Sequence, residues 1–581
     1  MKELKTVLIS DGIDTLLEAL NEKHPSLGSG QAVVCNEDGN LVGVITDSDF
    51  RRFILSNDRL PTKIDEILNR NPIAIELGDS SDLQGRELAS ILTSRGWETN
   101  FPINFVVVTK NNKPIRLQSI SDFSTNIEKI RDTIVIFGLG FVGLTLGIFF
   151  AESGLNVVGI DSDKKKIDSL RRKKVYLYEP GLEEALTKVL DVNFFVFENK
   201  NDYVQTIQNQ KGARNIFFIT VGTYLGENNE VDFTGLDQVS NEIAAMIKAN
   251  DLIALRSTLS IGTTENRVRE ILESKSGLVA GVDFSLTYAP ERTIEGNALK
   301  ELKELPQIIG GITLNCRSKI KRIFESAGVK VVEVSSCKAA ELIKLTSNAY
   351  RDVNFAFANE IARISIENHL SPDEIIESAN YSYSRNLIAK PSPGVGGPCL
   401  WKDSLILAEG TKDPEFLIAA RKVNIKVIYD WLDFIIQQVQ STHILKGNLN
   451  VLILGVTFKG VPETNDTRNS SSVIIMKELK KLKYDVEYWD YILNEVVNTD
   501  YSIEKSLEDF RKYSKQKNYH VVIIANNHPQ NRIKFLEIAK EIPSKEKIVL
   551  ADPWKLLTSE DRISLGNKII YFGMGLPDNY E

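Results

Sequence analysis

A glycine-rich turn between a predicted strand and a predicted helix limits the folds open to this chain. The apolar run at residues 133–137 leads into the turn, which consists of Gly138, Leu139, Gly140, Phe141, Val142 and Gly143. Gly138 permits a sharp turn, Gly140 lets the backbone approach a pyrophosphate, and Gly143 allows close packing of the helix. The start of the helix offers free N–H groups and a positive dipole end to phosphates. The pattern predicts a dinucleotide site within a βαβ unit.

The next predicted strand ends in an acidic residue at the spacing that such a site requires. Asp161 lies 23 residues after Gly138, where a carboxylate binds the 2′-hydroxyl of a ribose. This carboxylate would repel a 2′-phosphate, so we predict NAD rather than NADP as the cofactor. Lys166 is close enough along the chain to lie beside the same ribose and to weaken that preference. The alternative interpretation is that Asp161 only ends a strand.

The chain of 581 residues is too long for one ordinary core and divides into four predicted segments. Residues 1–128 twice show the order helix, strand, turn, strand, which predicts a small α+β domain. Strands alternate with helices in residues 131–330 and again in 441–581. Residues 331–440 are predicted to be helical, with a long helix between Ser336 and His369. The predicted fold class is α/β, with two Rossmann-like domains of parallel sheet joined by a long central helix.

Composition and charge argue against several classes of function. The net charge of −8 opposes broad nucleic-acid binding. The cysteines, at positions 35, 316, 337 and 399, and the five histidines lack the paired spacing of a metal site, so no metal is expected. Residues 133–151 carry no charge, but their four glycines fit a strand, a turn and a helix better than a membrane span. With unpaired cysteines and no signal sequence at the start, we expect a cytoplasmic protein that binds neither nucleic acid nor membranes.

Cys399 is the candidate nucleophile. Glycines and prolines crowd the residues before it, at Pro391, Pro393, Gly394, Gly396, Gly397 and Pro398. They predict an irregular, tightly turned loop in which a thiol can meet a substrate carbon closely. Lys402 could lower the pKa of this thiol. The alternative is that Cys399 is a small buried apolar residue, which is the commoner role of a single cysteine.

Two further groups of polar residues are candidates for the same site. Lys344 and Asn348 are four residues apart in the long helix, so both project from one face and can hold a negative oxygen. Their neighbours are largely apolar, which argues against the alternative of a solvated polar face. Glu291 and Glu295 follow a predicted strand at its carboxyl end, where parallel sheets bind ligands. A charged surface loop is the alternative there.

Seven segments in a fixed order resemble the UDP-glucose/GDP-mannose dehydrogenase family over about residues 131–581. They are GLGFVG with Asp161, EPGL at 179–182, RSTLSIGTT at 256–264, APERTIEG at 289–296, AELIKLTSNAYRDVNFAFANE at 340–360, PGVGGPCLWKD at 393–403 and GVTFKGVPETNDTRNSS at 455–471. The 55 residues from Lys344 to Cys399 also fit that family. Seven colinear segments make the resemblance highly specific.

The resemblance implies a four-electron oxidation of the C6 primary alcohol of a nucleotide sugar to a carboxylate. Cys399 would form a thiohemiacetal and then a thioester, while two NAD molecules accept hydride in succession. Lys344 and Asn348 would stabilise each tetrahedral oxyanion. Asp403 would orient Lys344 or a water, and Glu291 would act in hydrolysis of the thioester.

The resemblance also implies how ligands are held. Thr258 would position the catalytic water. Besides the glycine-rich turn, Asp161 and Lys166, the residues that would contact NAD are Thr223, Glu295 and Arg468. Those that would contact the nucleotide sugar are Lys402, Phe458 and Lys459. Arg385 would act near the sugar, a role sometimes supplied by a neighbouring subunit, and the long helix would form a homodimer or higher homo-oligomer.

Arg292 bears on the choice of sugar, because UDP-glucose members of the family typically carry an aromatic residue at this place. UDP-N-acetyl-mannosamine or UDP-N-acetyl-glucosamine is therefore the first expectation, with UDP-glucose or GDP-mannose as alternatives. The loop GGPCLWKD departs from the GGHC form of many N-acetylmannosamine enzymes. More remote alternatives are a catalytically silent nucleotide sensor and a two-electron hydroxyacid dehydrogenase. The intact Cys399 and Lys344 count against the first, and the second Rossmann-like half counts against the other.

Residues 1–128 resemble a pair of CBS domains. The clearest match runs from Gly43 to Arg52, in which Thr46 and Asp49 would hold the ribose or phosphate of an adenine nucleotide. Ser119 and Asp122 are the nearest counterparts in the second half. We hypothesise an adenine-nucleotide sensor, with a structural or dimerising module as the alternative.

Overall fold

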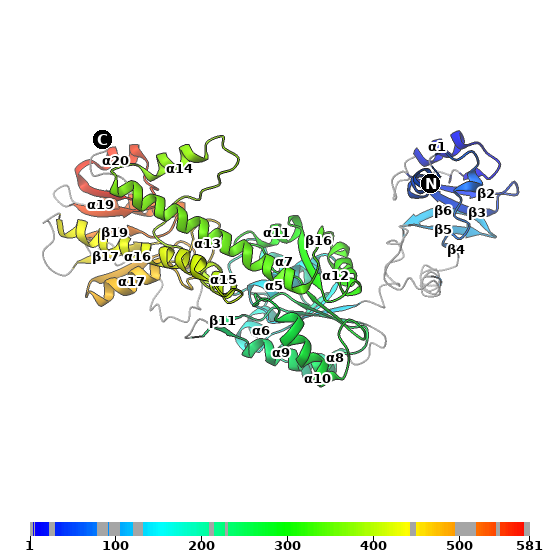
Figure 1. Ribbon diagram of the computed structural model, residues 1–581, viewed down its shortest axis with the longest axis horizontal. Helices are drawn as coiled ribbons and strands as arrows, with labels where there is room; N and C mark the ends of the chain where they lie inside the picture. The colour runs from blue at the N-terminus through cyan, green and yellow to red at the C-terminus, as the bar shows by residue number, and fades with distance from the viewer. Residues whose placement is uncertain are drawn as a thin grey trace. The chain divides into compact units, whose positions relative to one another are not determined.

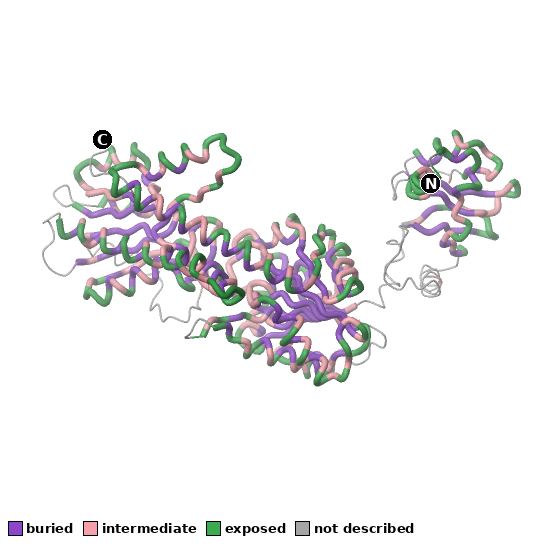
Figure 2. Tube along the Cα trace, viewed as in Figure 1, coloured by how far each residue is buried: buried purple, intermediate pink, exposed green. Residues whose placement is uncertain are grey.

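The computed structural model divides into two compact units, residues 1–131 and residues 132–581, and each is described by itself. The structure describes residues 4, 6–21, 30–57, 59–77, 91, 105–119, 132–207, 214–226, 230–441, 449–493, 519–541 and 547–574. Buried segments follow the strands in both units, so each unit has a core of its own (Figure 2).

The first unit contains two three-stranded sheets of the same design. In each sheet, β1-β2-β3 and β4-β5-β6, the first pair of strands is parallel and the second pair antiparallel. The elements are β1 (Thr6–Leu8), α1 (Ile13–Asn21), β2 (Gln31–Cys35), β3 (Leu41–Thr46), α2 (Asp47–Asn57), η1 (Ile64–Glu66), β4 (Ala74–Glu76), β5 (Phe105–Lys110) and β6 (Lys113–Ser119). Val33 and Val44 of one sheet share a core with Phe105 and Val107 of the other. Of the second predicted helix, at residues 82–96, only Ile91 is described.

The second unit begins with an eight-stranded sheet in the order β16-β15-β14-β13-β10-β7-β8-β9. Its strands are β7 (Thr133–Phe137), β8 (Asn156–Ile160), β9 (Phe194–Phe197), β10 (Asn215–Ile219), β13 (Leu252–Leu255), β14 (Ser285–Tyr288), β15 (Gln307–Gly311) and β16 (Val331–Glu333). The prediction of a wholly parallel sheet was wrong at one place, because β15 runs antiparallel to β14. The connecting helix α11 (Ala298–Glu304) has seven residues and rises only about 10 Å, too little to return the chain along the sheet.

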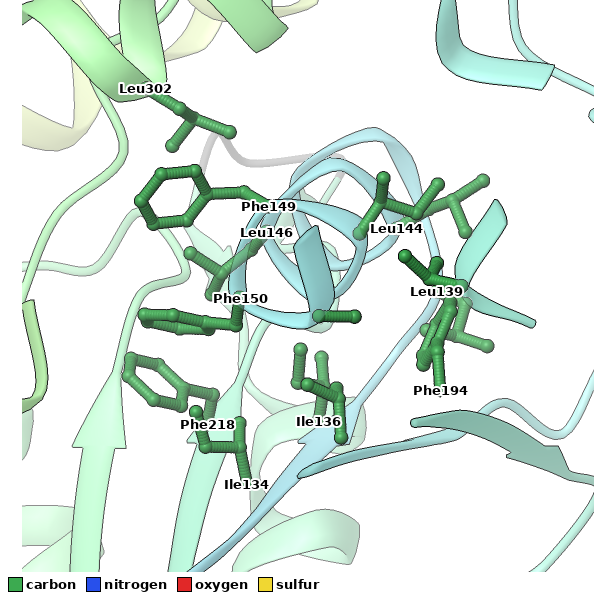
Figure 3. Packing of buried hydrophobic residues seen from close by; sticks show 14 of the residues in the cluster. Ile134, Ile136, Leu139, Leu144, Leu146, Phe149, Phe150, Phe194, Phe218 and Leu302 are labelled. Carbon is green, nitrogen blue, oxygen red and sulfur yellow. The ribbon is translucent and has the colours of Figure 1, made fainter. Parts of the chain in front are cut away.

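Helices cover both faces of this sheet and leave two apolar cores. They are α5 (Phe141–Glu152), α6 (Lys164–Arg171), α7 (Leu182–Val189), α8 (Lys200–Ile207), α9 (Thr234–Ala244), α10 (Arg269–Ser276) and α12 (Leu314–Ser326), with the short elements β11 (Tyr224–Leu225), β12 (Val231–Asp232) and η4 (Thr264–Val268). Helix α5 is buried from Gly143 to Ala151, and Phe149 and Phe150 pack against strand residues such as Ile134 and Phe218 (Figure 3). This burial explains why the helix carries no charged side chain from Gly143 to Ala151. Among the described residues, no helix has the length and apolarity needed to cross a membrane.

A long helix connects this domain to the next one (Figure 1). It is α13 (Cys337–Glu367), with 31 residues, and its bounds agree closely with the predicted helix. Three more helices follow, namely α14 (Pro372–Asn380), α15 (Pro398–Ala408) and α16 (Glu415–Ser441). Both α15 and α16 pack on α13. The segment before α15 therefore lies where three helices meet.

The chain ends in a second sheet, whose five strands are all parallel in the order β18-β17-β19-β20-β21. Its elements are β17 (Asn450–Leu454), α17 (Ser471–Lys481), β18 (Asp485–Trp489), β19 (Val521–Ile524), α19 (Pro529–Glu541), β20 (Ile548–Asp552), α20 (Ser559–Leu565), η7 (Gly566–Lys568) and β21 (Ile569–Gly573). The predicted fold class, two Rossmann-like domains joined by a long helix, is confirmed.

Candidate active site

The glycine-rich turn has the shape that a bound pyrophosphate requires. Gly138 adopts a positive φ of 93° and donates its N–H to Ile160 at 2.8 Å. A Cβ on Gly143 would lie 1.9 Å from the carbonyl oxygen of Gly138, so only glycine fits there. At Gly140, by contrast, no described atom lies within 4 Å of an added Cβ. At the amino end of α5, Gly143 is closely packed and Gly140 faces open space. This combination fits the phosphate of a dinucleotide.

Asp161 closes the same turn. It is 8% exposed, and its Oδ2 accepts a hydrogen bond from the N–H of Leu139 at 2.7 Å. The Nζ of Lys166 lies 3.3 Å from that oxygen. The carboxylate thus ends a strand and also faces the turn, so the two interpretations of Asp161 are compatible. Lys166 lies beside this carboxylate, at the place where a ribose would bind.

Cys399 is exposed, whereas Cys35, Cys316 and Cys337 are buried. It is the second residue of α15, which begins at Pro398 after a Gly397 of positive φ. A helix amino end favours a thiolate. Desolvation by the surrounding protein nevertheless raises the pKa of this thiol, and the charge of Asp403 adds to the rise.

Lys344 and Lys402 act on this thiol in the opposite direction. Both charges lower the pKa of Cys399, but desolvation and Asp403 outweigh them. The expected effect of Lys402 on the thiol is therefore present, but the net shift of the Cys399 pKa is upward. The physical reason is that the same enclosure that brings the cations close also removes water from the sulfur.

A buried hydrogen bond ties the long helix to the helix of the cysteine. The Nδ2 of Asn348 on α13 donates to the Oδ2 of Asp403 on α15 at 2.6 Å. Lys344 lies one helical turn away and is half-buried. Because one amide hydrogen of Asn348 is used by Asp403, the other is held in a fixed direction. Asn348 thus occupies Oδ2 of Asp403, and the orientation of Lys344 or a water by Asp403 stays a prediction.

Glu291 is held by Arg256, for which the sequence predicted no role. Its Oε2 accepts from Nη2 and Nε of Arg256, at 2.6 and 3.0 Å, and its Oε1 accepts from the N–H groups of Arg292 and Thr293. Burial works to raise the pKa of Glu291, but the charge of Arg256 and these hydrogen bonds hold it below its usual value. The carboxylate is therefore ionised at neutral pH. No local feature of the sequence marked Arg256, because its partner Glu291 is 35 residues away in the chain.

Thr223, Thr258 and Lys402 form one contact between the first Rossmann-like domain and α15. The hydroxyl of Thr223 donates to the carbonyl oxygen of Thr258 at 2.8 Å. The Nζ of Lys402 donates to the carbonyl oxygen and hydroxyl of Thr223, at 2.7 and 3.0 Å. Burial lowers the pKa of Lys402. This ammonium therefore lies between the cofactor domain and Cys399, three residues before it in α15.

The segment after β17 reaches across to Glu295. The Nζ of Lys459 donates to the carbonyl oxygen of Glu295 at 2.6 Å, and the hydroxyl of Thr464 donates to its Oε2 at 2.8 Å. Arg468 lies 4.0 Å from the same carboxylate. Burial, together with the charge of Asp466, raises the pKa of Glu295.

Phe458 and Arg385 complete the set of predicted residues. The ring of Phe458 lies against Gly397, where an added Cβ would approach it to 2.7 Å. Arg385 is exposed on the segment after α14 and lies over the ring of Tyr383. Hydrogen bonds and charge interactions thus connect a group of predicted residues across the two Rossmann-like domains, while Arg385 lies on the surface; the group comprises Cys399, Lys344, Asn348, Asp403, Lys402, Thr223, Glu295 and Lys459.

A cavity of about 410 Å³ opens beside this group of residues, lined by Pro180, Gly296, Val461, Pro462, Glu463, Tyr491, His528, Pro529 and Gln530. Glu463 bridges the two domains there, because it accepts from Tyr178 on one side and contacts the ring of His528 at 3.0 Å on the other. None of the predicted catalytic residues lines this cavity.

Two Rossmann-like domains around a cleft with an accessible thiol define the class of dinucleotide-dependent dehydrogenases. Comparison with known proteins narrows this class. Residues 132–328, 338–426 and 452–558 match the NAD binding, central and UDP binding domains of the UDP-glucose/GDP-mannose dehydrogenase family, and residues 1–56 match a CBS domain. The chain belongs to that family and is an NAD-dependent nucleotide-sugar dehydrogenase with an N-terminal CBS domain.

Two similar relatives are both UDP-N-acetyl-D-mannosamine dehydrogenases. The UDP-N-acetyl-D-mannosamine dehydrogenase of Pyrococcus horikoshii is 30% identical over 419 residues, which cover 72% of this chain and 94% of that protein. The enzyme of the same name from Methanocaldococcus jannaschii is 28% identical and matches 78% of this chain and 99% of its own length. The solved structure of the Pyrococcus enzyme superposes with a TM-score of 0.66 at 28% identity, over 77% of this chain and all of that one.

Proposed function

We propose that this enzyme oxidises the C6 alcohol of UDP-N-acetyl-D-mannosamine to the uronate through a covalent intermediate on Cys399. The observation that carries the proposal is an accessible thiol at the start of α15, beside Lys344 and the Asn348–Asp403 hydrogen bond. The names of the relatives support the sugar. UDP-N-acetyl-glucosamine is the second candidate, since Arg292 indicates an N-acetylhexosamine without choosing between its epimers.

The two oxidations require one carbon to stay at one place. The glycine-rich turn and Asp161 would hold NAD, which would supply the hydride acceptor for each oxidation. Between them, the thiolate of Cys399 adds to the aldehyde carbon and retains it. Lys344 and the free amide hydrogen of Asn348 donate to the oxygen that becomes negative; loss of one such donor typically costs about 10²–10³-fold in rate.

Hydrolysis of the thioester is assigned to Glu291 and Thr258. Because Arg256 keeps Glu291 ionised, its carboxylate can orient a water and accept a proton from it. Thr258 positions the same water. The nucleotide sugar would contact Lys402, Phe458 and Lys459, and Glu295 with Arg468 would contact NAD.

We propose a homodimer formed through α13. Three large apolar side chains on this helix, Tyr350, Phe357 and Ile364, are 55%, 50% and 44% exposed and recur every seven residues. At about 100° per residue they lie on the face opposite Lys344 and Asn348. A second copy packed on this stripe buries it without blocking the site, and the exposed Arg385 is then available to the neighbouring subunit.

The CBS domain is proposed to bind an adenine nucleotide. The hydroxyl and N–H of Thr46 donate to Oδ2 of Asp49, at 2.7 and 3.0 Å, at the start of α2. This pair is preorganised to face a ribose or phosphate at a helix amino end. The side chain of Ser119, and Asp122 as a whole, lie outside the described residues. With its cysteines free, we place the enzyme in the cytoplasm.

The test is a panel of nucleotide sugars. Purified full-length protein is incubated with NAD and, separately, UDP-N-acetyl-mannosamine, UDP-N-acetyl-glucosamine, UDP-glucose and GDP-mannose, and the uronate is detected by mass spectrometry. The highest kcat/KM is expected with UDP-N-acetyl-mannosamine. A preference for UDP-glucose or GDP-mannose would overturn the choice of sugar, and no uronate from any of them would overturn the proposed activity.

A further inference from the structure

One fully buried arginine joins the helices that carry the two halves of the proposed active site. Arg421 of α16 is 2% exposed, and its Nη1 donates to Oδ1 of Asp352 on α13 at 2.7 Å. Asp352 is itself completely buried. It lies one helical turn beyond Asn348, on the helix that also carries Lys344. The ion pair therefore links α16 to α13, the helix that carries the proposed oxyanion donors.

The same guanidinium holds the backbone on both sides of Cys399. Its Nη2 donates to the carbonyl oxygen of Val395 at 3.0 Å, and its Nη1 also approaches that of Leu400 at 3.3 Å. The guanidinium carbon lies 5.2 Å from the ring centre of Trp401. A planar fork with several donors can make these contacts at once, which a lysine ammonium cannot do in the same geometry.

A second line of hydrogen bonds strengthens this connection. Asn424, one turn after Arg421 in α16, donates to the carbonyl oxygen and carboxylate of Asp352, both at 2.8 Å. Asn359 of α13 donates to Asn424 at 3.0 Å and accepts from the N–H of Ser392 at 2.9 Å. The glycine- and proline-rich loop is thus fixed to α13 and α16 at both of its ends.

We propose that Arg421 is a positioning residue that sets the place of the Cys399 thiol relative to Lys344 and Asn348. This inference rests on the proposed function. Arg421 touches neither the sugar nor NAD in this assignment. Its effect is on the backbone that carries the nucleophile, because it binds that backbone and the helix of the oxyanion donors with one rigid group.

Misplacement of the thiol should affect one step more than the others. The first oxidation, in which the alcohol gives aldehyde, NADH and a proton, makes no bond to sulfur. The next step forms a carbon–sulfur bond between the thiolate and the aldehyde carbon, and it depends on their separation. A displacement of about 1 Å can cost on the order of 10²-fold in such a step. Uncaptured aldehyde then leaves as its hydrate.

The test compares Arg421→Lys with the wild-type enzyme and with Arg214→Lys, a matched change in the half-buried pair Arg214–Asp132 away from the site. Reactions contain NAD, the nucleotide sugar and O-benzylhydroxylamine, which converts free aldehyde to an oxime with loss of water. For Arg421→Lys we expect oxime as the main product, uronate reduced about 10²-fold, and KM values for NAD and sugar within about twofold. The control should form uronate without oxime. Uronate at the wild-type rate, or a fall in uronate with no oxime formed in its place, would overturn the proposal.

A second variant and a second readout guard against simple unfolding. Asn424→Ser leaves Arg421 in place and should release less oxime than Arg421→Lys, though more than the wild type. Independently, labelling of Cys399 by iodoacetamide is followed by peptide mass spectrometry, with the buried Cys35 and Cys337 as references for folding. Arg421→Lys should change the labelling rate of Cys399 alone. An unchanged labelling rate of Cys399 would contradict the inference. Failure of the wild type to oxidise any of the sugars tested would count against the proposed function only, because the labelling experiment needs no sugar.

Discussion

At the scale of single residues, Cys399 is subject to opposing influences. The amino end of α15 and the charges of Lys344 and Lys402 favour its thiolate. Desolvation in the cleft and the charge of Asp403 favour the thiol, and they prevail. We therefore expect a nucleophile that is mostly protonated in the free enzyme at neutral pH.

This raised pKa predicts the pH dependence of alkylation. Since only the thiolate reacts, the rate of labelling of Cys399 by iodoacetamide should rise close to tenfold per pH unit from about pH 7 to 9, without levelling off. The rate is measured on the free enzyme by peptide mass spectrometry. A plateau below about pH 8 would show a stabilised thiolate and contradict the assignment.

Glu291 gives a second prediction at this scale. Glu291→Gln removes the charge that Arg256 holds and should slow thioester hydrolysis by about 10²–10⁴-fold. Both hydride transfers should still occur once, so NADH appears as a burst while a covalent adduct collects on Cys399. Intact-protein mass spectrometry detects the adduct, and Glu409→Gln, an exposed change on the C-terminal side of α15, serves as control. Steady turnover without an adduct would exclude this role.

The sequence indicated residues that stand in a local motif, and it did not indicate residues whose role depends on distant partners. Cys399 stood out by its loop, and Lys344 with Asn348 by helical spacing. Arg256 and Arg421 did not, because a buried cation is recognised only by its partners, and these are 35 and 69 residues away in the chain. Phe357 is one of the apolar residues that follow the Lys344–Asn348 pair in α13, and its side chain is half exposed.

At the scale of elements, apolar runs long enough to fill a strand were predictable and short or mixed ones were not. The strands β7, β8, β10, β13 and β14 lie where the sequence placed them. β9, β15 and β21 were missed; β15 and β21 each end in glycine, which resembles a loop border. The start of α15 was hidden by prolines and glycines that indicated only a loop, although proline is common at the first position of a helix.

The glycine-rich turn offers a test that separates binding from folding. Gly140→Ala places a methyl group in open space, at a backbone conformation open to alanine, so the melting temperature should be unchanged. The methyl occupies the path of the pyrophosphate, so the Kd for NAD should rise by about tenfold or more. Gly235→Ala, also in open space but on α9, is the control. Unaltered NAD affinity, measured by calorimetry, would mean that the cofactor does not cross Gly140.

At the scale of the whole molecule, residues 132–581 hold every proposed catalytic residue, while residues 1–131 form a separate compact unit. The family order of the segments could be predicted from sequence because alternating periodicities and fixed motifs are local. The antiparallel β15 could not, because it depends on how far α11 carries the chain. The CBS match covers residues 1–56, so half of the expected pair is supported by sequence similarity.

The proposed regulation belongs to this scale as well. Calorimetry of the full chain should detect binding of AMP, ADP or ATP, and the double variant Thr46→Ala, Asp49→Ala should lose it with basal dehydrogenase activity unchanged. The reason is that both side chains face the helix start at α2 and lie in the separate N-terminal unit. Absence of nucleotide binding to the wild type would leave only a structural role for the unit.

The stoichiometry of the reaction tests the central claim most directly. With NAD in excess and the nucleotide sugar limiting, NADH is measured by absorbance and uronate by mass spectrometry. Two NADH per uronate are expected, and Cys399→Ser should form none of the acid. One NADH per molecule of final product would contradict capture of the aldehyde by Cys399.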